Sequence, residues 1–178
     1  MSNALQGKHV AILVTDGFEQ VELTSPRDAL KAAGASVDIL ADKSGKVDGW
    51  NHDKPADSFT VDKTFENASL ADYDAIVLPG GVFNSDNIRM DTHAQSLVLE
   101  AAGSGKPIAV ICHGAWILAS TDLVRGKTIT SFPSLKDDLT NAGADWVDQE
   151  VVVDGELISS RTPDDLPAFN KALVAALS

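Results

Sequence analysis

The chain has 178 residues, 44% of them hydrophobic and 22% charged, and its 14 Lys and Arg against 26 Asp and Glu give a net charge of −12. This length predicts one domain over residues 1–178 with a core of its own, and the balanced composition excludes disordered, collagen-like and coiled-coil chains. The negative charge disfavours nucleic-acid backbones and anionic membrane surfaces as partners. The single cysteine excludes internal disulfides and metal sites built from several thiolates.

The sequence shows no sign of export or membrane insertion. Its first residues lack the basic stretch followed by an apolar stretch that is typical of a secretory signal. No segment approaches the roughly 18 apolar residues of a membrane span. We therefore expect a soluble, cytoplasmic protein.

Short apolar runs alternate with helical patterns from the first strand onward. Residues 10–14 form a continuous apolar run, which is typical of a strand covered on both faces. The apolar spacing over residues 21–33 predicts a helix that ends at Gly34, and residues 37–41 predict the next strand. A β-α-β unit of this length implies parallel strands. Residues 42–74 are polar without a clear period and predict a loop with short edge strands.

The second half of the chain repeats this alternation. Residues 75–78 predict a buried strand, residues 87–102 a helix, and residues 107–111 a strand that runs directly into Cys112. The remaining predicted elements are a helix over 115–119, a strand over 128–131, a helix over 135–141, a hairpin of 150–153 and 157–160 around an Asp-Gly turn, and a last helix ending at Leu177 that is capped by Thr162.

This pattern predicts an α/β fold with a doubly wound, flavodoxin-like, mainly parallel sheet between helices. In such folds ligands bind beyond the carboxyl ends of the strands. Three strand-to-helix corners meet at that edge, and each carries reactive or anion-binding groups: Thr15-Asp16-Gly17-Phe18-Glu19, Pro79-Gly80-Gly81 and Ile111-Cys112-His113-Gly114.

Cys112 is the candidate nucleophile. It lies at the turn between a buried strand and a helix, where a nucleophile elbow can expose the sulfur and a helix N-terminus can lower the thiol pKa well below its free value. Gly114 gives room for so sharp a turn. The alternative is a structural cysteine that packs as a small apolar side chain.

His113 is the one histidine expected at this edge, because His9 begins the first strand, His52 lies in the polar insert and His93 falls within a helix. It can accept and return the proton of the thiol, as in other Cys-His pairs. An exposed turn histidine is the alternative.

Two carboxylates and two glycines complete the candidate site. Glu19 and Glu22 are three residues apart at the start of the first helix, so they share a face. One of them can reach Cys112 and, when protonated, donate a hydrogen bond to its sulfur; the alternative is simple complementarity with the helix dipole. The N–H groups at Gly80 and Gly81 can form an oxyanion hole, although a plain turn explains them as well.

Three motifs in the same order resemble the DJ-1/PfpI family, which has a class I glutamine-amidotransferase-like fold. These motifs are Gly17-Phe18-Glu19-Gln20-Val21-Glu22-Leu23, Val77-Leu78-Pro79-Gly80-Gly81 and Ala109-Val110-Ile111-Cys112-His113-Gly114. The resemblance covers nearly the whole chain, and residues 136–161 are similar to the PfpI (protease I) branch, which includes bacterial general stress proteins.

The resemblance implies roles for particular residues. Cys112 is the nucleophile, Glu22 the buried carboxyl that touches its sulfur, and His113 the adjacent base, while Gly81 and His113 donate to the oxyanion. In PfpI-like oligomers a carboxylate after the Gly-Gly corner orients the histidine across a subunit interface, and Asp86 best matches that position. The stretch before Asp86 is one residue longer than usual and lacks a proline.

The resemblance leaves two classes of function open. One is a cysteine-dependent enzyme that acts on small carbonyl compounds or glycated protein in the manner of the family's deglycases, glyoxalases and peptidases, as a homodimer or higher homo-oligomer without metal or cofactor. Phe132 stands where related sequences often have tyrosine, which disfavours strong peptidase activity. The other class is a non-catalytic stress sensor or chaperone that uses oxidation of Cys112. A flavodoxin-like nucleotide binder is disfavoured because the first β-α corner lacks a glycine-rich phosphate loop.

Overall fold

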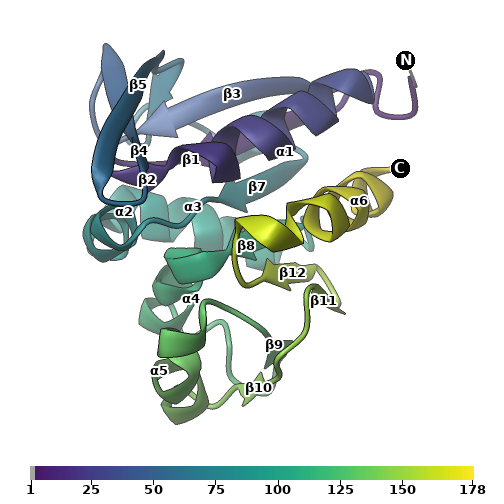
Figure 1. Cartoon of the computed structure of the whole chain (residues 1–178). Coiled ribbons are helices and arrows are strands. Elements are labelled where there is room, and N and C mark those ends of the chain that lie inside the picture. Colours follow the sequence, from purple (N-terminus) through teal and green to yellow (C-terminus); the bar gives the residue numbers. More distant parts are fainter. Residues whose placement is uncertain (1–2) are drawn as a thin grey trace.

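A computed structural model describes residues 3–178, which form a mainly parallel sheet between two layers of helices (Figure 1). The seven strands follow the order β11-β12-β8-β7-β1-β3-β6, and only β11 runs antiparallel to its neighbour. Their bounds are β1 His9–Leu13, β3 Ser36–Ala41, β6 Lys63–Thr64, β7 Ala75–Leu78, β8 Ile108–Ile111, β11 Val152–Asp154 and β12 Leu157–Ser160. The predicted fold class is confirmed.

The central strands are fully buried because each side of the sheet has its own helical layer. On one side, α1 (Gln20–Ala32) and α6 (Leu166–Leu177) pack against alternate strand residues such as Ile12 and Val77. On the other side, the intervening residues meet the remaining helices, which are α2 Val82–Ile88, α3 Thr92–Gly103, α4 Trp116–Ser120 and α5 Lys136–Asn141. Continuous apolar runs with strand length were therefore sufficient to predict these strands.

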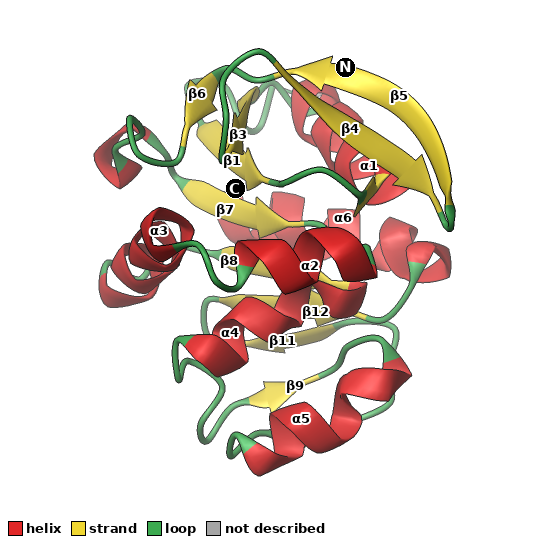
Figure 2. Ribbon diagram, turned by 90° about the vertical axis from the view of Figure 1, so that its left-hand side faces the viewer, coloured by secondary structure: helices red, strands yellow, loops and turns green. Residues whose placement is uncertain are grey.

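The segment predicted as a loop with short edge strands forms a long hairpin instead. Strands β4 (Lys46–Asn51) and β5 (Lys54–Thr60) pair antiparallel, and the short β2 (Phe18–Glu19) joins β4. The hairpin extends away from the main sheet (Figure 2). Because β5 is exposed along nearly its whole length, it has no apolar alternation that a sequence pattern could reveal.

The helix predicted over residues 87–102 is two helices. Helix α2 ends at Ile88, and α3 begins after Asp91, whose carboxylate accepts hydrogen bonds of 2.9 Å from the N–H groups of His93 and Ala94. This N-cap stabilises a new helix start. Helix α2 thus begins directly after Gly81, at the corner that carries the candidate oxyanion donors.

The C-terminal part follows the prediction with smaller differences. Strand β9 is Thr128–Ile129, pairs with β10 (Asp145–Trp146) and ends two residues before the predicted limit. The hairpin of β11 and β12 is confirmed. Thr162 makes no side-chain capping bond, and a short 3₁₀ turn, Pro163–Asp165, precedes α6. In the part of the chain described, no helix is long and apolar enough to cross a membrane.

Candidate active site

Cys112 lies on a sharp corner directly after β8. Its φ of 62° is in the left-handed region that residues with a side chain rarely adopt, so the surrounding structure holds it there. Gly114 allows the corner to pack closely, since a Cβ at this position would meet the carbonyl oxygen of Leu78 at the end of the neighbouring strand. The backbone therefore has the form of a nucleophile elbow.

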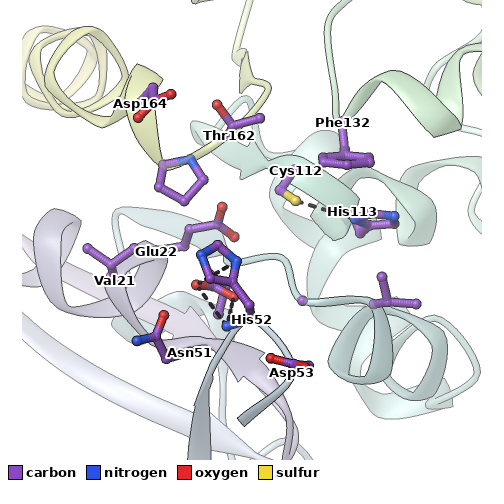
Figure 3. A pocket seen from close by; sticks show the side chains of 14 residues that line it. Val21, Glu22, Asn51, His52, Asp53, Cys112, His113, Phe132, Thr162 and Asp164 are labelled. Atoms are coloured by element: carbon purple, nitrogen blue, oxygen red, sulfur yellow. Dashed lines mark hydrogen bonds and ion pairs between the residues drawn. The ribbon is translucent and has the colours of Figure 1, made fainter. Parts of the chain in front are cut away.

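The sulfur of Cys112 faces a cavity of about 720 Å³ at the carboxyl edge of the sheet (Figure 3). Five of the predicted site residues line it, namely Glu19, Glu22, Gly81, Cys112 and His113. Its other walls come from the tip of the β4–β5 hairpin, from Phe132 and from the turn before α6. Asp86 is absent from the lining of this cavity.

His113 is held on two sides. Its Nδ1 lies 3.3 Å from Cys112 Sγ, and its Nε2 lies 3.3 Å from the hydroxyl oxygen of Ser134. The ring stacks on Phe132 with 4.6 Å between centroids and meets Trp116 edge-on at 5.2 Å. Burial lowers the pKa of His113, so the ring is neutral near pH 7 and can take the proton of the thiol at Nδ1.

Ser134 is a contact that sequence reasoning missed. It lies in the 3₁₀ turn Pro133–Leu135, and no motif marks it. If Nε2 of His113 carries the proton, the hydroxyl of Ser134 accepts it in a hydrogen bond and Nδ1 is left free as the base. Ser134 therefore orients the His113 ring within one chain, a role for which sequence reasoning had found no residue of the same chain.

Glu22 is the carboxyl next to the sulfur. It is completely buried, and its Oε1 accepts a 2.9 Å hydrogen bond from the N–H of Gly80. Its Oε2 has no hydrogen-bond partner among the described residues 3–178. Burial raises the pKa of Glu22 to about 8, the Gly80 hydrogen bond opposes this, and the charge of Glu19 adds to it. Glu22 is therefore protonated near pH 7 and can act as a donor.

The prediction of a lowered Cys112 pKa is wrong. Burial raises the pKa of this thiol, and the negative charge of an ionised Glu22 raises it further. The N–H groups of His113 and Gly81 hydrogen-bond to the sulfur and lower the pKa, but they do not outweigh the burial. The thiol thus keeps its proton until His113 removes it, and the two buried acids titrate as a pair.

Glu22→Leu is expected to slow the alkylation of Cys112 by iodoacetamide about ten- to a hundredfold near pH 7, whereas Glu22→Gln should stay within about threefold of the wild type. Glutamine can still donate to the forming thiolate, and leucine cannot. The measurement is the alkylation rate against pH for all three proteins. Equal rates in both variants would contradict a hydrogen bond from Glu22 to the sulfur.

His52 lines the same cavity, which corrects the expectation that His113 would be the only histidine there. It lies at the hairpin tip with φ of 57°. Its backbone N–H donates to Glu19 Oε2 at 3.1 Å, and its ring Nδ1 lies 4.0 Å from Glu19 Oε1. Glu19 therefore holds the hairpin tip against the cavity. The sequence could not show this, because 33 residues separate the two partners.

The corner at Gly80 and Gly81 is fixed by a second residue that sequence reasoning missed. The side chain of Asn84 is fully buried, and its Nδ2 donates to the carbonyl oxygens of Pro79 at 3.1 Å and Gly80 at 2.9 Å. Its Oδ1 accepts from the N–H of Thr15 at 2.7 Å. A Cβ on Gly80 would lie 2.7 Å from both Cys112 Cβ and Glu22 Oε1, so only glycine fits between them.

We expect Asn84→Ala to lower the free energy of unfolding by about 2–4 kcal/mol, because it leaves the buried N–H of Thr15 and the carbonyl oxygen of Pro79 without partners and removes one of the two hydrogen bonds to the carbonyl oxygen of Gly80. The exposed Asn87→Ala on the same helix is the matched control and should change stability by less than about 0.5 kcal/mol. Urea unfolding measures both. A loss from Asn84→Ala no larger than that of the control would show that this network does not stabilise the corner.

Asp86 is exposed on α2 and makes no contact with His113 of its own chain. It lines a separate hollow with Gly17, Trp50, His52 and others from the hairpin and α2. No carboxylate is within hydrogen-bond or ion-pair distance of His113 in the described chain, residues 3–178. The role expected for Asp86 therefore requires a second subunit.

Comparison with known proteins gives one consistent assignment. The family model described as DJ-1/PfpI family matches residues 8–176. "Protein/nucleic acid deglycase 2" of Escherichia coli is 42% identical over 171 residues, which cover 96% of this chain and 98% of the relative. YraA of Bacillus subtilis, provisionally named a cysteine protease, is 42% identical over 164 residues, or 92% of this chain and 95% of the relative.

A solved structure from Anabaena variabilis has the same fold. It superposes with a TM-score of 0.91 at 38% identity and covers 96% of this chain. The match spans 48% of that protein, which contains DJ-1/ThiJ/PfpI-like and ferritin-like domains. The agreement of the family model, the relatives and this structure extends over the elements that carry Glu22, Gly81 and Cys112.

Proposed function

The chain belongs to the DJ-1/PfpI family, and on this premise we propose that it is a cysteine-dependent enzyme acting on small carbonyl compounds or their adducts on protein, as a deglycase or glyoxalase does. The relatives named deglycase and cysteine protease support an enzymatic role. The observation that carries the proposal is the position of Cys112 Sγ, 3.3 Å from a neutral His113 and facing a cavity that can hold a small molecule.

The proposed chemistry begins with proton transfer from the Cys112 thiol to Nδ1 of His113. The sulfur then adds to the electrophilic carbonyl carbon of the substrate, and the carbonyl oxygen becomes an oxyanion. The N–H groups of Gly81 and His113 already point at the sulfur, so they are close to where that oxygen forms. One water is consumed in hydrolysing the adduct, the C–S bond breaks, and His113 returns its proton to the sulfur, which restores the free thiol.

Protonated Glu22 supports the first step. Its unpartnered Oε2 donates a hydrogen bond to the sulfur as negative charge develops there, which stabilises the thiolate in a buried site. Phe132 offers no hydroxyl where the family often has tyrosine. We therefore propose that peptide hydrolysis is weak compared with reaction at small carbonyls.

The test compares the wild type with Cys112→Ala for methylglyoxal consumption, release of adducts from glycated amino acids, and peptide hydrolysis. We expect the wild type to act on at least one of the first two substrates and Cys112→Ala to fall to the buffer rate. Glu100→Gln on α3 is the control, because it replaces an exposed carboxylate outside the cavity lining. No turnover by the wild type would favour the non-catalytic sensor or chaperone, which oxidation of Cys112 by peroxide would then test.

A further inference from the structure

The rim of the cavity around Cys112 is acidic. Besides the buried Glu22, it is lined by three carboxylates: Glu19 of β2, Asp53 of the hairpin tip and Asp164 of the turn before α6. Figure 3 shows Asp53 and Asp164 on different walls, each from a different element of the fold. No lysine or arginine lines the cavity within the described residues 3–178.

Two of these carboxylates have no partner in the part of the chain that the structure describes. Asp53 and Asp164 are exposed and form no ion pair or side-chain hydrogen bond within residues 3–178. Glu19 contacts His52, whose side chain is 79% exposed. The other basic side chain, His113, is kept neutral by burial, which lowers its pKa. The cavity mouth therefore holds negative charge that the chain itself leaves largely uncompensated.

The floor of the same cavity contains an unsatisfied polar atom. Glu22 Oε2 is completely buried and has no hydrogen-bond partner in the described chain, and its side chain extends toward Cys112 (Figure 3). A buried atom of this kind is normally paired, so it indicates a place for a polar group of a bound molecule or of the thiolate adduct. A bound molecule would thus have its reacting end at Cys112 and Glu22 and its remaining part beside Asp53 and Asp164.

We propose that this cavity selects carbonyl compounds that carry an ammonium or guanidinium group near the reacting carbon and disfavours those that carry carboxylates. This inference rests on the proposed function, because it names the substrate class of the same site. Carboxylates at the mouth attract a cation and repel an anion over distances of about 8–10 Å, the screening length at physiological ionic strength. An adduct on a lysine or arginine side chain meets this requirement, whereas a thiol adduct bearing free carboxylates does not.

Charged methanethiosulfonate reagents measure the field at the sulfur without any turnover. The Cys112 thiolate attacks the sulfenyl sulfur, methanesulfinate leaves with the bonding electron pair, and a mixed disulfide remains. Because Cys112 is the only cysteine, each modification reports this site. One reagent carries a trimethylammonium group and the other a sulfonate group. For each reagent, the rate of reaction with Cys112 is divided by its rate of reaction with 2-mercaptoethanol, and the two quotients are compared. We expect the cationic reagent to be favoured about tenfold, and less so as salt is raised.

Neutralising the two free carboxylates is the decisive variant. Asp53→Asn combined with Asp164→Asn should reduce the tenfold preference to about two- to threefold, while Glu100→Gln, which removes one charge elsewhere on α3, should leave it unchanged. A preference near one in the wild type would overturn the inference. An equal effect of the double variant and Glu100→Gln would also overturn it, because the net charge of −12 would then be the cause.

Turnover separates this inference from the proposed function. If Cys112-dependent turnover is found and a glycated arginine derivative is not processed faster than a carboxylate-bearing thiol adduct, the charge preference is wrong and the proposed function stands. If no carbonyl compound is turned over, the proposed function is wrong. The reagent ratio then still decides whether the cavity favours cations.

Discussion

The wild type is expected to lose stability as the pH rises from about 5 to about 8, and Glu22→Gln is expected to remove most of this loss. Burial raises the pKa of Glu22 from 4.5 to about 8 in the folded protein. In the unfolded chain the carboxyl ionises near its ordinary value, so between these two pH values the folded state binds one more proton. The free energy of unfolding then falls by up to about 1.4 kcal/mol per pH unit.

The full effect is about 3–5 kcal/mol across this range, because the shift spans more than three pH units. Glutamine never ionises, so its curve should lack this slope while keeping the buried hydrogen bond with Gly80. Urea unfolding at several pH values measures both proteins, with Glu100→Gln as the control for loss of one exposed carboxylate. Parallel curves for the wild type and Glu22→Gln would show that Glu22 is ionised in the folded state at neutral pH.

The sequence predicted the elements whose apolar residues face a helical layer. Strands β1, β7 and β8 are buried on both faces and appear as continuous apolar runs. The β4–β5 hairpin was not predicted as such because β5 is exposed on both faces, so its residues carry no alternation. The break between α2 and α3 left a signal, the Asp91 cap, but the apolar spacing continues across it.

The site was predicted as far as it depends on residues next to strand ends. Cys112, His113, Glu22 and Gly81 meet at one cavity because parallel strands end at the same edge. Long-range partners such as Ser134 and Asn84 were missed, since no local sequence pattern indicates which distant side chain forms a hydrogen bond with a buried group. The direction of the Cys112 pKa was missed for a related reason: the sequence shows the helix start that lowers it but not the depth of burial that raises it.

The orientation of His113 by Asp86 stays a prediction, because the two residues do not meet within one chain. It is exposed on α2 beside Phe83, which is 59% exposed and stacks on Trp50 at 6.2 Å. The hollow that Asp86 lines shares His52 and Val82 with the cavity of Cys112. A two-fold interface over α2 would cover these apolar side chains and bring Asp86 of one subunit to the other subunit's cavity. Ser134, which already contacts His113 in its own chain, is the competing partner.

Mixing inactive subunits distinguishes the two arrangements. Asp86→Ala should lower Cys112-dependent turnover by at least about tenfold if a carboxylate from the neighbour orients His113. Equal mixing of Cys112→Ala and Asp86→Ala chains makes about half of the dimers mixed, and each mixed dimer has one site with intact Cys112, His113 and Asp86. Turnover should therefore recover to about a quarter of the wild-type value per site once subunits exchange. Native mass spectrometry verifies that the subunits have exchanged. If turnover then does not recover, and Ser134→Ala also loses turnover, His113 is oriented within its own chain.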